Sequence, residues 1–264
     1  MARVALLGLP YDGSSSFQRG AAAAPAVIRS AFESSASNRT TRLGVDLDRL
    51  PAVHDAGDAN LTADTARESI ERAARALLDA GYRLLALGGD HSVTYPLLRA
   101  FRGRYPRLTL LHVDAHPDLY DEFEGDRYSH ACPFARIMEE ALVTRLVQVG
   151  IRCMTAHQRA QAERFGVEVH ELGFWKGPGE LRLEPPVYVS FDLDAVDPAF
   201  APGVSHREPG GLTSREAFAI LHAVPAPVVG ADLVELNPQN DSAGITAALA
   251  GRLVKELLGR MLED

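Results

Sequence analysis

The sequence has few cysteines, no long apolar run and no cluster of basic residues, and each absence excludes a class of protein. Cys132 and Cys153 form neither a CxxC pair nor a zinc-ribbon spacing, and two cysteines do not make a disulfide framework. No apolar run approaches the roughly 20 residues of a membrane span. The formal net charge is −8, so neither nucleic acid nor an anionic membrane is an expected partner. With so few cysteines, we expect a cytoplasmic protein.

What the sequence does contain is an alternation of short apolar runs and helical patterns. Strands are predicted at residues 4–9, 82–89, 107–115, 145–152, 185–194 and 227–236. Helices are predicted at residues 25–32, 62–80, 95–104 and 245–262. Strands that are apolar throughout and separated by helices indicate a mostly parallel sheet covered on both faces. We therefore expect a single doubly wound α/β domain over residues 1–264.

Polar side chains follow three of the predicted strands. In "VDAHPD" the residues Asp114, His116 and Asp118 alternate, so they share one face if the chain stays extended. Asp192 and Asp194 repeat the pattern in "SFDLD", and "LGGDHS" places His91 after a strand and two glycines. In a parallel sheet, ligands bind beyond the carboxyl ends of the strands. These three segments are therefore expected to meet.

Four carboxylates and two imidazoles at one place predict a metal centre. Carboxylates that lie close together raise one another's pKa values unless positive charge lies among them. The three segments contain no lysine or arginine, so divalent metal is the simplest counter-charge, and the number of ligands suits two ions. Such ligands suit Mn²⁺, and a metal pair that acidifies a bound water favours hydrolysis. Each segment alone has a plainer interpretation, since Asp90 in "GGDHS" could simply cap the following helix.

Taken together, the motifs resemble those of the ureohydrolases, the arginase, agmatinase and formimidoylglutamase family. The similarity runs from "GLPYDGSSSFQRGAAAAPAVIR" to "VVGADLVELNPQND" and includes "GGDHS", "DAHPD" and "SFDLDAVDPAFAPGVSHREPGGLT". It is greatest to plant-type arginases and their bacterial relatives, particularly in "HPDLYDEFEGDRYSHACPFARIME" and "APGVSHREPGGL". The resemblance implies a three-layer α/β/α arginase-like fold, two Mn²⁺ ions per subunit and assembly into homotrimers or homohexamers.

The resemblance also assigns the ligands. One manganese would be held by His91, Asp114, Asp118 and Asp192. The other would be held by Asp114, His116, Asp192 and Asp194, so that Asp114 and Asp192 bridge the two ions.

Two further roles follow from the same resemblance. Glu235 in "ADLVELNP" would receive a substrate guanidinium, and His130 in "YSHACPF" would transfer a proton to the leaving amine. We place His130 and Glu235, together with Asp118, at the reacting centre. Many arginases have glycine after this histidine, whereas Ala131 follows here. His112, inside an apolar run, is expected to be a core or supporting histidine rather than a ligand.

The expected reaction is hydrolysis of a cationic guanidino compound to urea and an amine, with L-arginine as the first candidate substrate. Arg127 and Ser129 are candidate contacts for the arginine carboxylate, although Arg127 could equally be a solvated loop residue. Agmatine is the principal alternative, and formimidoylglutamate, which carries a formimino group, or a guanidino acid other than arginine is a weaker one. A mononuclear zinc deacetylase and a metal-binding pseudoenzyme are the rival classes. Counting the bound metals separates the first rival, and a urea assay separates the second.

Overall fold

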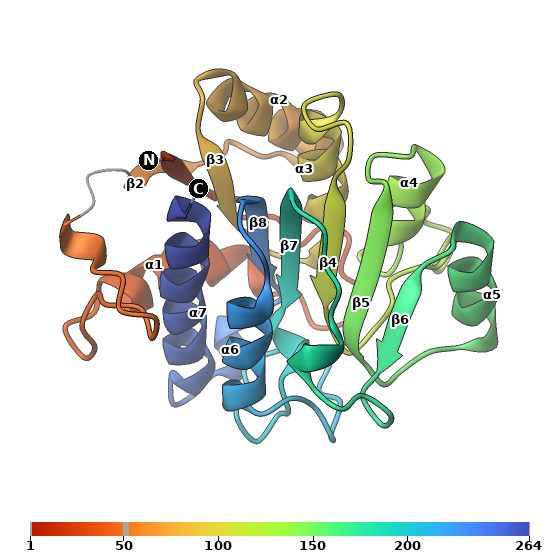
Figure 1. Ribbon diagram of the computed structural model, residues 1–264. Helices are drawn as coiled ribbons and strands as arrows, with labels where there is room; N and C mark the ends of the chain where they lie inside the picture. The colour runs from red at the N-terminus through yellow and green to blue at the C-terminus, as the bar shows by residue number, and fades with distance from the viewer. Residues whose placement is uncertain (1, 50–52, 264) are drawn as a thin grey trace.

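The computed structural model describes residues 2–49 and 53–263. The described residues form an eight-stranded sheet in the order β2-β1-β3-β8-β7-β4-β5-β6, and every neighbouring pair is parallel (Figure 1). The strands are β1 (Val4–Gly8), β2 (Val53–Asp58), β3 (Arg83–Leu87), β4 (Thr109–Val113), β5 (Arg145–Ile151), β6 (Glu168–Glu171), β7 (Val187–Asp192) and β8 (Val228–Val234). The predicted parallel α/β sheet is confirmed, and β2 and β6 add one strand to each edge.

Helices cover both faces of the sheet. They are α1 (Ala24–Glu33), α2 (Ala66–Asp79), α3 (Thr94–Phe101), α4 (Pro133–Glu139), α5 (Ala156–Phe165), α6 (Ser214–Ala223) and α7 (Ile245–Leu262). One apolar core joins the sheet to α1, α6 and α7, and a second joins it to α2, α3 and α4. Among the described residues, no helix is both long enough and apolar enough to cross a membrane.

The central strands are buried along their whole length, whereas the edge strands are not. Every residue of β4, β7 and β8 is buried. In β2, by contrast, each residue is exposed or partly exposed. Full burial of one aliphatic side chain contributes about 1.5–3 kcal/mol, so the central strands hold the layers together. They also fix the positions of the residues that follow them.

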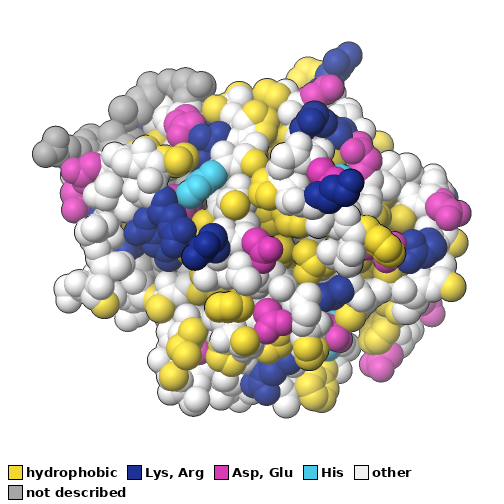
Figure 2. Space-filling view, turned by 60° about the horizontal axis from the view of Figure 1, so that its bottom comes forward, with side chains coloured by type: hydrophobic (Ala, Val, Ile, Leu, Met, Phe, Trp, Pro, Cys, Tyr) yellow, Lys and Arg dark blue, Asp and Glu magenta, His cyan; other side chains and the backbone are white. Residues whose placement is uncertain are grey.

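Figure 2 views the molecule with the lower end of Figure 1 brought forward. Acidic and basic side chains are interspersed with apolar ones over this face. The carboxyl ends of adjacent central strands β3, β8, β7 and β4 meet at one edge of the sheet because all four strands run in parallel.

Candidate metal centre and active site

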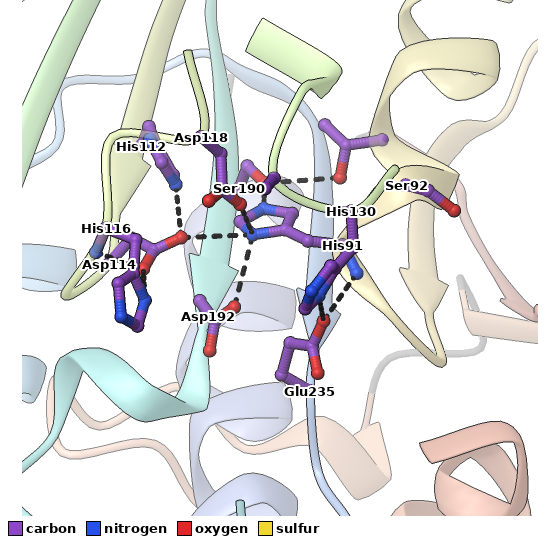
Figure 3. Close-up of polar contacts among 12 residues, drawn as sticks. His91, Ser92, His112, Asp114, His116, Asp118, His130, Ser190, Asp192 and Glu235 are labelled. Carbon is purple, nitrogen blue, oxygen red and sulfur yellow. Dashed lines mark hydrogen bonds and ion pairs between the residues drawn. The ribbon is translucent and has the colours of Figure 1, made fainter. Parts of the chain in front are cut away.

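Four neighbouring strands deliver the polar residues to one place (Figure 3). His91 follows β3, Asp114 follows β4, Asp192 ends β7 and Glu235 follows β8. The glycines before His91 let the backbones approach, since a Cβ on Gly89 would lie 1.9 Å from the Tyr11 carbonyl oxygen. The chain therefore brings the three predicted metal-binding segments together, and all six predicted ligands lie in this cluster.

His91 lies at the centre of three carboxylates. Its Nδ1 atom is 3.0 Å from Asp114 Oδ2, 3.2 Å from Asp118 Oδ2 and 3.1 Å from Asp192 Oδ2. The side chain is fully buried, yet Nδ1 forms no hydrogen bond of good geometry with any residue that the structure describes. Ligands of one octahedral ion at about 2.1 Å lie roughly 3 Å from one another, which matches this spacing. A buried nitrogen without a partner, surrounded by carboxylate oxygens, fits a divalent cation.

The opposite nitrogen of His91 shows which tautomer the structure favours. His91 Nε2 lies 2.9 Å from Ser190 Oγ, and Ser190 in turn donates to Asp232 Oδ1 at 2.7 Å. Tyr188 donates to the other oxygen of Asp232 at 2.7 Å. Because its proton goes to Asp232, the Ser190 hydroxyl accepts from Nε2–H of His91. The lone pair of His91 therefore lies on Nδ1, the atom that faces the carboxylates.

The second group of ligands is built around His116. Its Nδ1 atom is 3.1 Å from Asp194 Oδ2 and 3.5 Å from Asp114 Oδ1. Asp114 thus lies between the two histidines, with one oxygen facing His91 and the other facing His116. Asp114, His116 and Asp194 form one of the clusters that could hold an ion. This arrangement is the one that a bridging Asp114 requires.

His112 supports Asp114 from beneath. It is fully buried in β4, and its Nε2 atom lies 2.7 Å from Asp114 Oδ2. The side-chain amide of Gln148 donates to His112 Nδ1 at 2.9 Å, so Nε2 carries the proton and donates to Asp114. The prediction of a supporting core histidine at this position is confirmed.

The charges of the cluster do not balance without added positive charge. Burial raises the pKa of Asp192 well above its usual value, and the charges of Asp194 and Asp114 raise it further. Burial and the charge of Asp114 raise the pKa of Asp194 to about 6. Burial opposes ionisation of Asp114 too, but the charge and hydrogen bonds of neighbouring histidines hold its pKa well below the usual range. Divalent cations would allow all the carboxylates to ionise.

Glu235 and His130 form a pair beside this cluster. Glu235 Oε1 accepts the backbone N–H of His91 at 2.8 Å and lies 2.9 Å from His130 Nδ1. The backbone φ angles of Glu235 (66°) and Asp118 (49°) lie in the left-handed region, a strain that occurs often at functional sites. Burial lowers the pKa of His130, but its hydrogen bond to Glu235 and the charges of Glu235 and Asp90 raise it to about 9.

A cavity of about 500 Å³ opens over these residues. Its lining includes His116, Asp118, His130 and Glu235. The rest of the wall includes Tyr120, Phe123, Met154, Thr155, Gln158 and Glu208. The predicted reacting groups therefore share one cavity that is large enough for a small molecule.

Two predicted substrate contacts are not brought to this cavity. Arg127 lies outside the lining, and its guanidinium is held by Asp121 at 2.9 Å and Glu139 at 3.1 Å. Ser129 is buried away from the cavity, where its hydroxyl accepts the backbone N–H of Ala131 at 3.4 Å. The structure therefore does not bring Arg127 or Ser129 to the cavity, whereas Tyr120, Phe123 and His130 of the same segment line it.

The structure also adds wall residues that the sequence did not indicate. Ser16 and Glu208 line the cavity, and both come from loops without a periodic pattern. Arg152 follows β5 in the segment "GIRC", and a charged residue directly after a buried strand was the available signal. His206 also lines the cavity. Asp90 caps the turn before α3 by accepting the Ser92 N–H at 3.1 Å.

Comparison with known proteins decides the family. A sequence model described as "Arginase family" matches residues 2–259. The chain belongs to the arginase family. It is 43% identical to the protein named "Arginase 1, mitochondrial" from Arabidopsis thaliana, over 98% of this chain and 81% of that protein. It is 40% identical to proclavaminate amidinohydrolase from Streptomyces clavuligerus, over 97% of this chain and 87% of that protein.

Solved structures agree with this assignment. Arginase from Medicago truncatula superposes with a TM-score of 0.93 at 42% identity, covering 98% of this chain and 87% of that one. The proclavaminate amidinohydrolase structure gives 0.87 at 38% identity, with 99% and 92% covered. The fold is therefore arginase-like, and the chain is a hydrolase of amidino C–N bonds. The family is one of binuclear metal enzymes that act on small guanidino substrates, and the clusters described above could hold metal.

The same comparison corrects the expected location. The relatives from Arabidopsis thaliana and Oryza sativa are named mitochondrial arginases, and a second Arabidopsis thaliana arginase is named chloroplastic/mitochondrial. These names contradict the prediction of a cytoplasmic protein. A low cysteine count separates reducing from oxidising compartments, but it does not separate one reducing compartment from another.

Proposed function

We propose that this protein uses two Mn²⁺ ions to hydrolyse a guanidino compound to urea and an amine, with L-arginine as the first candidate substrate. The observation that carries the proposal is the unpartnered Nδ1 of His91 among three carboxylate oxygens. Carboxylates with imidazole suit manganese. The similarity to plant arginases supports arginine.

The proposed ligands divide into two sets that share Asp114 and Asp192. His91 and Asp118 complete the first set, and His116 and Asp194 complete the second. The short distances from the two histidines to the carboxylates support this division. When bound, the two ions supply Lewis acidity and activate water for hydrolysis.

Glu235 is proposed to hold the guanidinium. Within the described residues, its hydrogen bonds from His91 N–H and His130 both go to Oε1, which leaves Oε2 for a substrate N–H donor. A carboxylate that holds a planar guanidinium fixes the orientation of the guanidinium carbon. Fixed orientation of the reacting groups can remove a large part of the activation free energy of hydrolysis. Because Glu235 is only 4% exposed, the ion pair would form away from bulk water.

His130 is proposed to supply the proton that the leaving amine needs. As the C–N bond breaks, its electron pair stays on the amine nitrogen, which takes a proton from the imidazolium. Despite burial, the hydrogen bond to Glu235 and the charge of Glu235 raise the pKa of His130 to about 9, which favours the protonated ring that can supply this proton. Positioned acid catalysis of this kind contributes about 10²–10⁴-fold to a rate.

Agmatine is a second candidate, and one observation favours it. Arg152 is the only lysine or arginine on the cavity wall within the described chain. Its Nε, Nη1 and Nη2 atoms donate to the backbone carbonyls of Gly150, Asp194, Ala195 and Glu208. No N–H of that side chain remains for a substrate carboxylate, whereas the Glu208 side chain offers a carboxylate for an ammonium group.

A substrate panel tests the proposal. Mn²⁺-loaded protein is assayed for release of urea from arginine, agmatine and 4-guanidinobutyrate, and for release of formamide from formimidoylglutamate. The proposal expects urea, with kcat/KM highest for arginine. A higher value for agmatine would support the second candidate. If no substrate is hydrolysed and two Mn²⁺ ions are nevertheless bound per chain, the protein is a metal-binding pseudoenzyme and the proposal is wrong.

A further inference from the structure

The loop between β1 and α1 is held over the site by contacts that do not involve the predicted ligands. Asp90 Oδ2 accepts the backbone N–H of Ser14 at 2.9 Å. The backbone N–H of His130 donates to the Ser14 carbonyl at 3.1 Å. These bonds fix the loop to two segments far away in the sequence, after β3 and before α4. They place Ser16 on the cavity wall beside the His130 ring.

Ser16 meets His130 through two of its own groups. The Ser16 backbone N–H points at His130 Nε2 at 3.2 Å, and the Ser16 hydroxyl lies 2.8 Å from the same nitrogen. A backbone N–H can only donate, so in this arrangement Nε2 is an acceptor. The remaining proton of the neutral ring is then on Nδ1 and is donated to Glu235 at 2.9 Å.

The Ser16 hydroxyl can also serve the charged ring. When His130 gains a second proton, that proton lies on Nε2, because Nδ1 is already protonated. A hydroxyl can rotate from donating to accepting, whereas a backbone N–H cannot. His130 is only 8% exposed, but Ser16 is exposed and lines the cavity. The hydroxyl therefore connects a nearly buried nitrogen to the space where substrate would lie.

We propose that Ser16 is a positioning residue for His130 and carries its proton to the cavity. Its backbone N–H keeps the proton of the neutral ring on Nδ1, and its hydroxyl is the partner of Nε2 in both protonation states. In this step the Nε2–H proton of His130 passes to Ser16 Oγ, and at the same time the hydroxyl proton of Ser16 passes to the departing amine nitrogen. Ser16 ends as a hydroxyl and His130 as a neutral ring. This inference rests on the proposed function, in which His130 supplies the amine proton.

The neighbouring serines provide a matched control. Ser15 Oγ donates to Asp90 at 3.3 Å, and Ser14 Oγ lies 3.3 Å from the Tyr11 hydroxyl. Of these three consecutive serines, Ser16 is the one whose side chain reaches His130. Removal of the Ser15 hydroxyl changes the same loop without touching the His130 ring.

The test compares Ser16→Ala, Ser16→Thr and Ser15→Ala with the wild type, each loaded with Mn²⁺ and assayed on the best substrate of the panel. We expect Ser16→Ala to lower kcat about tenfold and to change KM less than about twofold, because only proton transfer is affected. Ser16→Thr keeps a hydroxyl and should retain most of the activity. Manganese per chain and the melting temperature should match the wild type in all three variants.

A second arm asks whether Ser16 acts through His130. In a His130→Asn background, Ser16→Ala should cause no further loss, since the two residues belong to one proton path. A further tenfold loss in that background, loss of manganese in Ser16→Ala, or a normal kcat in Ser16→Ala would each overturn the inference. If the wild type is active but Ser16→Ala is unchanged, only this inference fails. If the wild type hydrolyses none of the substrates, the proposed function fails and this inference fails with it.

Discussion

Two buried carboxylates in this molecule, Asp192 and Glu256, are equally hidden from water but differ in their surroundings. Each is 2% exposed. Glu256 on α7 lies 2.7 Å from Arg252 Nη2 and 2.9 Å from His222 Nε2, and it also accepts the backbone N–H of Arg42 at 3.0 Å. Asp192 accepts a backbone N–H at 2.7 Å, but its other oxygen faces the unpartnered nitrogen of His91.

The difference shows how a structural carboxylate can be told from a functional one. Burying a charge is costly unless a partner of opposite charge and hydrogen bonds come with it. Around Glu256 the chain supplies that partner itself, so the negative charge of Glu256 is balanced within the fold. Around Asp192 the nearest charged groups include Asp114 and Asp194, which are also acidic. A divalent cation bound among these carboxylates would balance their charge, and that property marks the site.

The largest effect is expected from a substitution of Asp192, the carboxylate without a cationic partner of its own. Asp192→Ala removes a proposed bridging ligand, so we expect bound manganese to fall from two ions per chain to one or none. Urea production should fall at least ~10³-fold, because the metal pair activates the water. Inductively coupled plasma spectrometry gives the manganese content, and a urea assay gives the rate. Full turnover by a metal-free Asp192→Ala protein would refute the dinuclear proposal.

The next effect concerns Glu256. Glu256→Gln leaves the partly exposed Arg252 guanidinium without its counter-charge, and it weakens hydrogen bonds to a buried charged group, which contribute about 1.5–3 kcal/mol each. We expect the free energy of unfolding to fall by about 3 kcal/mol in a urea titration. Manganese content and kcat should stay at wild-type values because α7 lies outside the cavity wall. A stable Glu256→Gln protein that loses manganese would show that the two groups are not independent.

The same contrast explains which parts of the fold could be predicted. The central strands are mostly apolar because they are buried on both faces, and the sequence predicted each of them. The strands β2 and β6 were missed. Their sequences, "VHDAGD" and "EVHE", are polar, since an edge strand is partly exposed. The helix at residues 245–262 was predicted with its observed bounds because its apolar spacing is regular.

The site divides in the same way. The proposed metal ligands follow central strands at regular spacing, so their meeting could be predicted from the sequence. Ser16 and Glu208 reach the cavity through irregular loops, and no local pattern specifies where a loop will lie. Arg127 does not reach the cavity, because charge alone does not bring a side chain inward. Its surface partners, Asp121 and Glu139, hold it outside the cavity.

The smallest expected effect is a difference in reactivity between the two cysteines, one in the open cavity and one in the closed interior. Cys153 is partly exposed and lines the cavity, whereas Cys132 is fully buried. Burial raises the pKa of Cys132 to about 12, so its reactive thiolate is scarce at pH 8. We expect Ellman's reagent at pH 8 to modify one thiol per folded chain and two per chain in urea. Cys153→Ser should abolish the reaction of the folded protein. Equal reaction rates for both thiols in the folded wild type would show that the interior behind His130 is open to the reagent. The core around Cys132 would then not be closed off from the cavity.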